Sequence, residues 1–224
     1  LRISRSSGRP DGTAVQPCGV ASQRKATFPI PQVRGTTECR RHLRRHHHRV
    51  GLLSRILARA AGLSAQHSDA VAEAGALHDL GKLFVAECIL ENAGQLDEVE
   101  LRIIRRHSIW GHLMLSRRHG PTFDLAARVA LQHHECWDGT GYPFGLRGDE
   151  ICIEARIVTI CDVYDALRAP RPYKTGFFHD DAMARIIRGD ERIRPTMFDP
   201  RLLDVFEQVQ DACRVAIEGM DCDA

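Results

Sequence analysis

Long apolar stretches are missing from this 224-residue chain, and no run approaches the length that a membrane-spanning helix needs. The pattern of a secretion signal, a basic end followed by an apolar run and a small-residue cleavage site, is absent too. Eight cysteines are present, but no two have CxxC spacing, which argues against a zinc ribbon or a thioredoxin-type site. We therefore expect reduced thiols and a cytoplasmic protein.

Lysine is scarce, because only Lys25, Lys82 and Lys174 are lysines among 31 basic residues. Where arginine supplies nearly every positive charge, a retained lysine indicates a need for a compact ammonium group. Residues 1–49 carry eleven basic and two acidic side chains, without the interleaved aromatics that would favour nucleic-acid binding. The rest of the chain is net acidic, which suits either bound metal cations or a solvated surface.

Strand-like alternation of polar and apolar residues is also lacking, and apolar residues recur instead with a helical period from residue 46 onward. This periodicity predicts an all-α fold, a compact bundle of about six to seven helices. Hydrophobic residues at 43% and charged residues at 27% are ordinary for a globular domain. Residues 1–40 are predicted to be an irregular or disordered basic arm, and residues 41–224 the folded domain.

Several helix ends can be predicted from capping residues. Gly81 is expected to end the helix that runs to Asp79. A capping-box pattern at Asp97 and Glu100 opens another helix, whose apolar stripe continues as one unit to Leu115. Asp199 followed by Pro200 predicts the start of the last helix.

Polar side chains interrupt the apolar faces of five predicted helices. Each one taken alone is explained equally well by a helix-end charge, a cap or a surface position. Together they are harder to dismiss, because a buried imidazole or carboxylate is costly unless it is paired or bound to a metal. Imidazole and carboxylate ligands without thiolate suit Fe, Mn, Zn or Co. The residues are His46, His78, Asp79, His107, His133, His134 and Asp162.

The order of these motifs resembles the HD phosphohydrolase superfamily and, within it, the HD-GYP domain family. His78-Asp79 is similar to the HD motif of the superfamily. The run His133-His134-Glu135, followed by Asp138-Gly139-Thr140-Gly141-Tyr142-Pro143, resembles the HD-GYP signature. The segments DVYDAL from Asp162 and RPYK from Arg171 follow at compatible spacing. The resemblance covers roughly residues 46–206.

The resemblance implies an HD-type helical fold and a phosphodiesterase that hydrolyses cyclic di-GMP to linear pGpG, with further hydrolysis to GMP left open. It implies that a metal-bridged hydroxide attacks phosphorus, with Asp79 bridging two ions and Lys82 assisting catalysis. The implied metal ligands are His46, His78, Asp79, His107, His133, His134 and Asp162. Adjacent helical residues point about 100° apart, so His133 and His134 are expected to reach different ions.

Six further residues would contact substrate by the same resemblance: Gly141, Tyr142, Pro143, Asp165, Arg171 and Lys174. Tyr142 would stack on guanine and Asp165 would accept from a guanine edge, while Arg171 and Lys174 would hold phosphate oxygens. Each of these four also has an ordinary explanation. Tyr142 can cover core, Asp165 can be a helix-surface acid, and the two cations can belong to a solvated loop.

Two divalent ions, Fe or Mn, are the expected cofactors. Some family members place Glu four residues before the first ligand; this chain has His42 there, which favours two ions over three. Expected partners are cyclic di-GMP, diguanylate cyclase (GGDEF) proteins and an upstream sensor or receiver domain, with no nucleic acid. Two alternatives remain: an HD-type hydrolase of another nucleotide, and a catalytically silent module that binds cyclic di-GMP.

Overall fold

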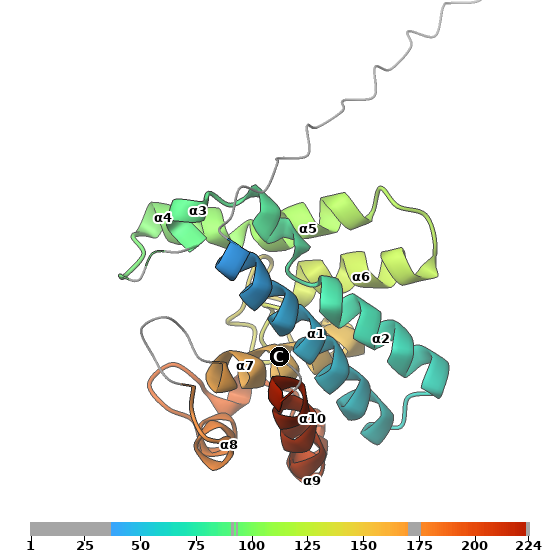
Figure 1. Ribbon diagram of the computed structural model, residues 1–224. Coiled ribbons are helices and arrows are strands. Elements are labelled where there is room, and N and C mark those ends of the chain that lie inside the picture. The colour runs from blue at the N-terminus through green and yellow to red at the C-terminus, as the bar shows by residue number, and fades with distance from the viewer. Residues whose placement is uncertain (1–36, 91, 93, 170–175, 223–224) are drawn as a thin grey trace, which may run out of the picture. The chain divides into compact units, whose positions relative to one another are not determined.

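The computed structural model describes residues 37–90, 92, 94–169 and 176–222 (Figure 1). Within these ranges the regular elements are all helical and no strand occurs, so the predicted all-α fold is confirmed. Most of the predicted arm lies outside the described residues. Its last residues, 37–40, belong to the first helix, which begins before the expected start at His46.

The described residues contain ten α-helices and three short 3-10 helices. The α-helices are α1 (Thr37–Ala60), α2 (Ala65–Leu77), α3 (Glu87–Leu90), α4 (Glu98–Arg105), α5 (His107–Leu115), α6 (Pro121–Gln132), α7 (Ile153–Arg168), α8 (His179–Arg188), α9 (Pro200–Gln208) and α10 (Gln210–Cys222). The 3-10 helices are η1 (Leu80–Phe84), η2 (Gly148–Glu150) and η3 (Pro195–Met197).

These are more helices than the six or seven predicted, partly because two predicted helices are each divided. The capping box at Asp97 and Glu100 is present, but α4 ends at Arg105. There the Arg106 N–H donates to Ile103 O at 3.1 Å, a 3-10 bond that tightens the turn before α5. The last predicted helix, which opens at its Asp199 N-cap, is divided at Val209 into α9 and α10.

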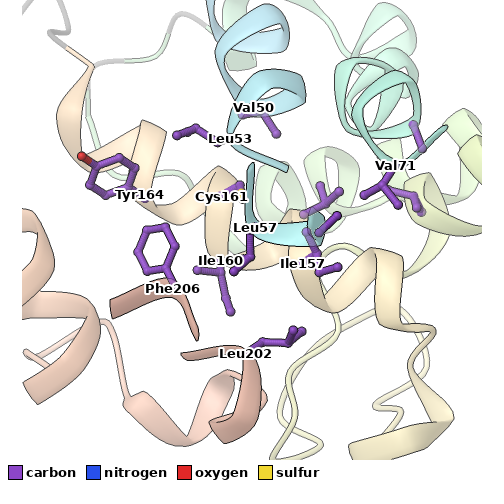
Figure 2. Close-up of a cluster of buried hydrophobic side chains, with 14 of the residues drawn as sticks. Val50, Leu53, Leu57, Val71, Ile157, Ile160, Cys161, Tyr164, Leu202 and Phe206 are labelled. Carbon is purple, nitrogen blue, oxygen red and sulfur yellow. The ribbon is translucent and has the colours of Figure 1, made fainter. Parts of the chain in front are cut away.

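The largest buried apolar cluster forms where α1 packs against α2, α7, α9 and α10. Figure 2 shows Leu57 of α1 beside Ile160 of α7, with Phe206 of α9 beside Tyr164 of α7. Leu57 and Phe206 are fully buried, and each such side chain stabilises the fold by about 1.5–3 kcal/mol. This core holds α1 and α7 in fixed register, and both helices carry polar residues beyond it.

None of the helices that the structure describes is both long enough and apolar enough to traverse a lipid bilayer.

Candidate metal centre

Helix ends bring most of the polar residues singled out by sequence to one place. His78 follows the last residue of α2, His133 follows the last residue of α6, and His107 is the first residue of α5. His46 and Asp162 come from within α1 and α7, which the core holds side by side. Where a helix ends, successive side chains are no longer about 100° apart around its axis, so a dipeptide such as His78-Asp79 can direct both side chains toward the same site.

Two overlapping groups of side chains have the spacing that a metal ion requires. The first contains Asp79, His107, His133 and His134, and the second contains His46, His78 and Asp79. Asp79 belongs to both groups, and its carboxylate is 2% exposed. One carboxylate with an oxygen toward each group is the arrangement expected for a ligand shared by two ions.

In the first group, three imidazole nitrogens approach one another closely. His107 Nε2 lies 3.3 Å from His133 Nε2 and 3.1 Å from His134 Nε2. Asp79 Oδ1 lies 3.2 Å from His107 Nε2 and 3.7 Å from His133 Nε2. His133 and His134 both belong to this first group, so the divergence expected of helical neighbours is not observed, and which ion each residue serves stays a prediction. His134 lies beyond the end of α6, and the two rings lie 4.1 Å apart in the same group.

The second group is built around the other oxygen of Asp79. His78 Nε2 lies 3.3 Å and His46 Nε2 lies 3.6 Å from Asp79 Oδ2. Asp162 Oδ1 stands beside both, 3.3 Å from His46 Nε2 and 3.7 Å from His78 Nε2. Asp162 is thus placed to add a second carboxylate to this group.

Backbone carbonyls fix the tautomers of three of these imidazoles. Each Nδ1 donates to the carbonyl three residues earlier: His78 to Gly75 O at 2.6 Å, His107 to Ile104 O at 2.5 Å and His133 to Ala130 O at 3.0 Å. A carbonyl can only accept, so Nδ1 carries the proton, and in a neutral ring Nε2 keeps its lone pair. Three lone pairs therefore face the groups from separate helices, and outer hydrogen bonds of this kind orient metal ligands.

Unpartnered buried atoms indicate that these residues fit a metal. His78 Nε2 and Asp79 Oδ1 are buried and have no hydrogen-bond partner. Leaving such atoms unsatisfied costs about 1–3 kcal/mol each, whereas coordination of a cation would satisfy both. Nitrogen and oxygen donors without thiolate suit a divalent ion, and HD-domain phosphohydrolases bind divalent metals.

The electrostatics of the cluster favour positive charge at its centre. Against the cost of burial, Asp79 and Asp162 raise the pKa of His78 to about 10. Burial lowers the pKa of His107 to about 4 and lowers the pKa values of His133 and His134 as well. Although burial opposes ionisation of Asp79, Lys82 and His78 hold its pKa well below the usual range. Two ionised carboxylates thus favour a positive charge beside them, which a protonated His78 supplies in the metal-free protein and a bound cation would supply in its place.

Lys82 reaches this centre from its edge. It lies in η1, three residues after Asp79, and its Nζ donates to Asp79 Oδ2. The side chain is 27% exposed, so the ammonium group lies between solvent and the buried carboxylate. Lys82 is therefore directed at the centre and is not simply a charge at the end of α2.

The loop that carries the GYP sequence is held by a buried glutamate. Glu135, which is 1% exposed, accepts from Phe144 N at 2.7 Å and from Leu146 N at 2.9 Å. A Cβ added at Gly141 would lie 2.3 Å from Cys136 N. Gly141 thus permits close packing of the loop on its own chain, and its predicted contact with substrate stays a prediction.

Tyr142 lies over the first group. Its ring stacks on that of His134, with centroids 4.7 Å apart and planes 25° apart, and its N–H donates to His134 O at 3.0 Å. The guanidinium of Arg105 lies over the Tyr142 ring, 5.2 Å from its centroid. Pro143, which follows through a cis peptide bond, is half-buried. Guanine stacking by Tyr142 and a substrate contact by Pro143 remain predictions.

The remaining predicted substrate residues divide into two cases. Asp165 is fully buried, and both its oxygens are engaged by His46 and Arg49, so its predicted contact with a guanine edge is wrong. Arg171 and Lys174 lie outside the described residues.

Three residues of the site escaped sequence reasoning. Arg49 lies one helical turn after His46, so its i, i+3 spacing was an available signal. Glu135 follows the two histidines, but only its burial and its two backbone donors give it a role. Arg105 has no sequence signal, since it meets Tyr142 only through the fold.

Comparison with known proteins places this arrangement in context. A family model described as HD domain matches residues 37–202. The cyclic di-GMP phosphodiesterase response regulator RpfG of Xanthomonas campestris pv. campestris is 39% identical over 156 residues, which is 70% of this chain and 40% of that protein. The 3'3'-cGAMP-specific phosphodiesterase 3 of Vibrio cholerae is 40% identical over 139 residues, covering 62% of this chain and 30% of that protein.

The chain therefore spans less than half the length of these two relatives. Among solved structures, Bd1817 of Bdellovibrio bacteriovorus, described as an HDG"Y"P protein, superposes with a TM-score of 0.57 at 21% identity. That match covers 74% of this chain and 52% of the other, and it supports the fold.

Proposed function

The chain belongs to the HD domain family, in its HD-GYP branch, and from this premise we propose that it is a metal-dependent phosphodiesterase that hydrolyses cyclic di-GMP to linear pGpG. One observation carries the proposal. Imidazoles and carboxylates from separate helices converge around Asp79, and two buried atoms among them, His78 Nε2 and Asp79 Oδ1, have no hydrogen-bond partner. A relative that shares 39% identity is named a cyclic di-GMP phosphodiesterase response regulator.

We propose two divalent ions, Fe or Mn, as the cofactors. His107, His133, His134 and Asp79 would hold one ion, and His46, His78, Asp79 and Asp162 the other. Two such ions would act as Lewis acids toward a phosphodiester and would lower the pKa of bound water to about 7. The chain contributes fixed ligand orientation, because backbone carbonyls hold the rings of His78, His107 and His133.

Lys82 is proposed to act on the reacting phosphate. Its ammonium group is anchored on Asp79 at the solvent edge of the centre, where a phosphodiester would have to enter. From there Nζ can neutralise charge that develops on a phosphate oxygen and can donate a proton toward the leaving oxygen.

Lys82→Ala is expected to keep both ions and to lower kcat by about 10²–10³-fold, because a donor to developing charge is lost. Metal analysis of the purified variant, together with steady-state turnover of cyclic di-GMP, measures the two effects separately. Lys82→Arg, which keeps the charge, is the matched variant. Turnover at the wild-type rate would contradict the role in catalysis, and loss of metal would show that Lys82 instead holds Asp79 in place.

Arg105 is proposed to bind substrate through its positively charged guanidinium. Its exposed guanidinium lies over Tyr142, whose ring covers His134 of the first group. An arginine there can bind a phosphate oxygen of an incoming dinucleotide, or the face of its base.

Arg105→Ala is expected to raise KM for cyclic di-GMP about tenfold with a smaller change in kcat, because a charge-assisted contact is worth about 1.5–3 kcal/mol. Initial rates over a range of substrate concentration give the two constants. Arg102→Ala removes another exposed arginine of α4 and is the control. An equal rise in KM for both variants would show that Arg105 attracts the anionic substrate only through its charge and makes no specific contact with it.

The activity itself is tested by incubating protein loaded with Fe²⁺ under anaerobic conditions, or with Mn²⁺, with cyclic di-GMP and separating the products by chromatography. We expect linear pGpG to accumulate. Absence of product with both metals would refute the proposal. Tight binding of cyclic di-GMP without turnover would favour a silent binding module instead.

A second substrate is favoured by a specific observation, since a relative with 40% identity is named a 3'3'-cGAMP-specific phosphodiesterase. Rates with cyclic di-GMP and 3'3'-cGAMP, measured side by side, decide between these substrates. An HD-type hydrolase of another nucleotide would be recognised by a wider substrate panel. Diguanylate cyclase partners and an upstream sensor or receiver domain remain proposals, consistent with the greater length of the relatives.

A further inference from the structure

Asp165 is a buried carboxylate without a role in the function proposed above. It lies in α7, one turn after Asp162, and its side chain has no exposed surface. A charged group is buried in this way only when close partners compensate its lost hydration. The contacts of Asp165 therefore indicate its purpose.

Both oxygens of Asp165 are directed at α1. Oδ2 accepts from His46 Nδ1 at 2.7 Å, while Arg49 donates through Nε to Oδ1 at 2.5 Å and through Nη2 to Oδ2 at 3.2 Å. The fork of the guanidinium thus fixes the plane of the carboxylate. Arg49 is itself buried, at 7% exposure.

His46 differs from the other oriented histidines in the partner of its outer nitrogen. His78, His107 and His133 each donate from Nδ1 to a backbone carbonyl of their own chain segment. His46 lies in the middle of α1, where backbone carbonyls are occupied by helical hydrogen bonds, and it donates to Asp165 instead. A carboxylate orients an imidazole as a carbonyl does and also makes its Nε2 a stronger donor to a metal.

We propose that Asp165 is a positioning residue, held by Arg49, that directs Nε2 of His46 toward the second group and thereby sets the affinity of the ion bound there. The inference rests on the proposed metal centre. It predicts an asymmetric effect, because Asp165 contacts His46 of the second group, whereas His107 and His133 of the first group are oriented by backbone carbonyls.

The alternative is an ion pair that only fastens α1 to α7. The two explanations differ in what a neutral isostere changes. Asn at position 165 can accept from one donor only, since its amide nitrogen faces the other, so either His46 or Arg49 loses its partner. If the ion pair only fastens α1 to α7, the change to Asn would lower stability and nothing else. If Asp165 positions His46, the change would also weaken the binding of one ion.

The test uses Asp165→Asn and a matched control, Asp199→Asn. Asp199 is also a buried aspartate, 2% exposed and paired with Arg156 and Arg201, but it belongs to neither group. Metal-free protein is titrated with Mn²⁺, free Mn²⁺ is followed by electron paramagnetic resonance, and stability is measured by thermal unfolding. Wild-type protein is expected to bind two ions per chain.

Asp165→Asn is expected to bind the first ion normally and the second about 10–100-fold more weakly, with the control unchanged. Two ions bound with wild-type affinity would overturn the proposal. If Asp165→Asn does not fold, Arg49→Gln decides in the same assay, since it frees Asp165 to rotate. Failure of the wild-type protein to bind Mn²⁺ or Fe²⁺ would refute the metal centre itself. Equal weakening of both ions in Asp165→Asn would instead refute only the positioning role of Asp165.

Discussion

Asp79→Ala is expected to abolish turnover of cyclic di-GMP and to leave less than one tightly bound ion per chain. Asp79 is the only residue common to the two groups of the described structure, and both its oxygens approach imidazole nitrogens. Its loss removes one ligand from each ion and the anchor of Lys82. A fall in kcat of at least about 10³-fold, near 4 kcal/mol in the barrier, is expected from the combined losses.

Metal analysis of the purified variant and a single-turnover assay at saturating substrate check this result. Asp79→Asn keeps the shape of the side chain and should also fail to hold both ions, since an amide has only one oxygen. Asp211→Ala removes an exposed aspartate of α10 and serves as the control. An Asp79→Ala protein with two ions and measurable turnover would contradict the shared role of this carboxylate.

Gly81→Ala is expected to lower the free energy of unfolding by about 3 kcal/mol or more, and to disturb the metal centre as well. A Cβ at this position would lie 1.8 Å from His107 O and 2.5 Å from Gly111 N. These are backbone atoms of α5, so relief requires η1 and α5 to move apart. His107 begins α5 and belongs to the first group, so the same movement displaces a ligand.

Chemical denaturation of the metal-free protein measures the stability, and a titration with Mn²⁺ measures the ligand displacement. Gly219→Ala is the matched control because a Cβ there meets nothing within 4 Å. Gly219 lies in the last turn of α10, where the change to Ala should stabilise the protein by about 0.5–1 kcal/mol, an effect of the opposite sign. Equal and small effects at both positions would contradict the close contact of η1 with α5.

The sequence marked Gly81 as structurally important, but for a reason other than its contact with α5. It was expected to end the second helix, but Gly81 lies within η1 and does not have the positive φ of a glycine that ends a helix. Helix-end signals describe the local chain, whereas Gly81 is required by a contact with a helix that follows some 25 residues later. Local patterns do not report such distant contacts.

The helical class of the described residues was predictable because the apolar period is a local property of each segment. Leu53 and Leu57 of α1 and Ile157 and Ile160 of α7 occupy the inward positions that this period predicts. The division at Arg106 was not predictable in the same way. The apolar stripe continues across it, and the turn is tightened by one 3-10 bond.

The chemical character of the centre was readable from residue types alone, since imidazoles and carboxylates at apolar positions need a compensating charge. Their grouping was not. His133 and His134 were expected to diverge as helical neighbours, but His133 is already the C-cap of α6, and both join one group.

What the sequence by itself determined is the helical period, the caps and the chemical types of the side chains, because these depend on neighbours along the chain. Only the tertiary structure decided that Asp165 faces His46 and not substrate, that Gly141 packs on its own loop, and that Arg105 covers Tyr142. The physical reason is that these roles depend on how α1 packs against α7, and on where the loop after α6 closes relative to α4. Both arise from packing between segments that are distant in sequence.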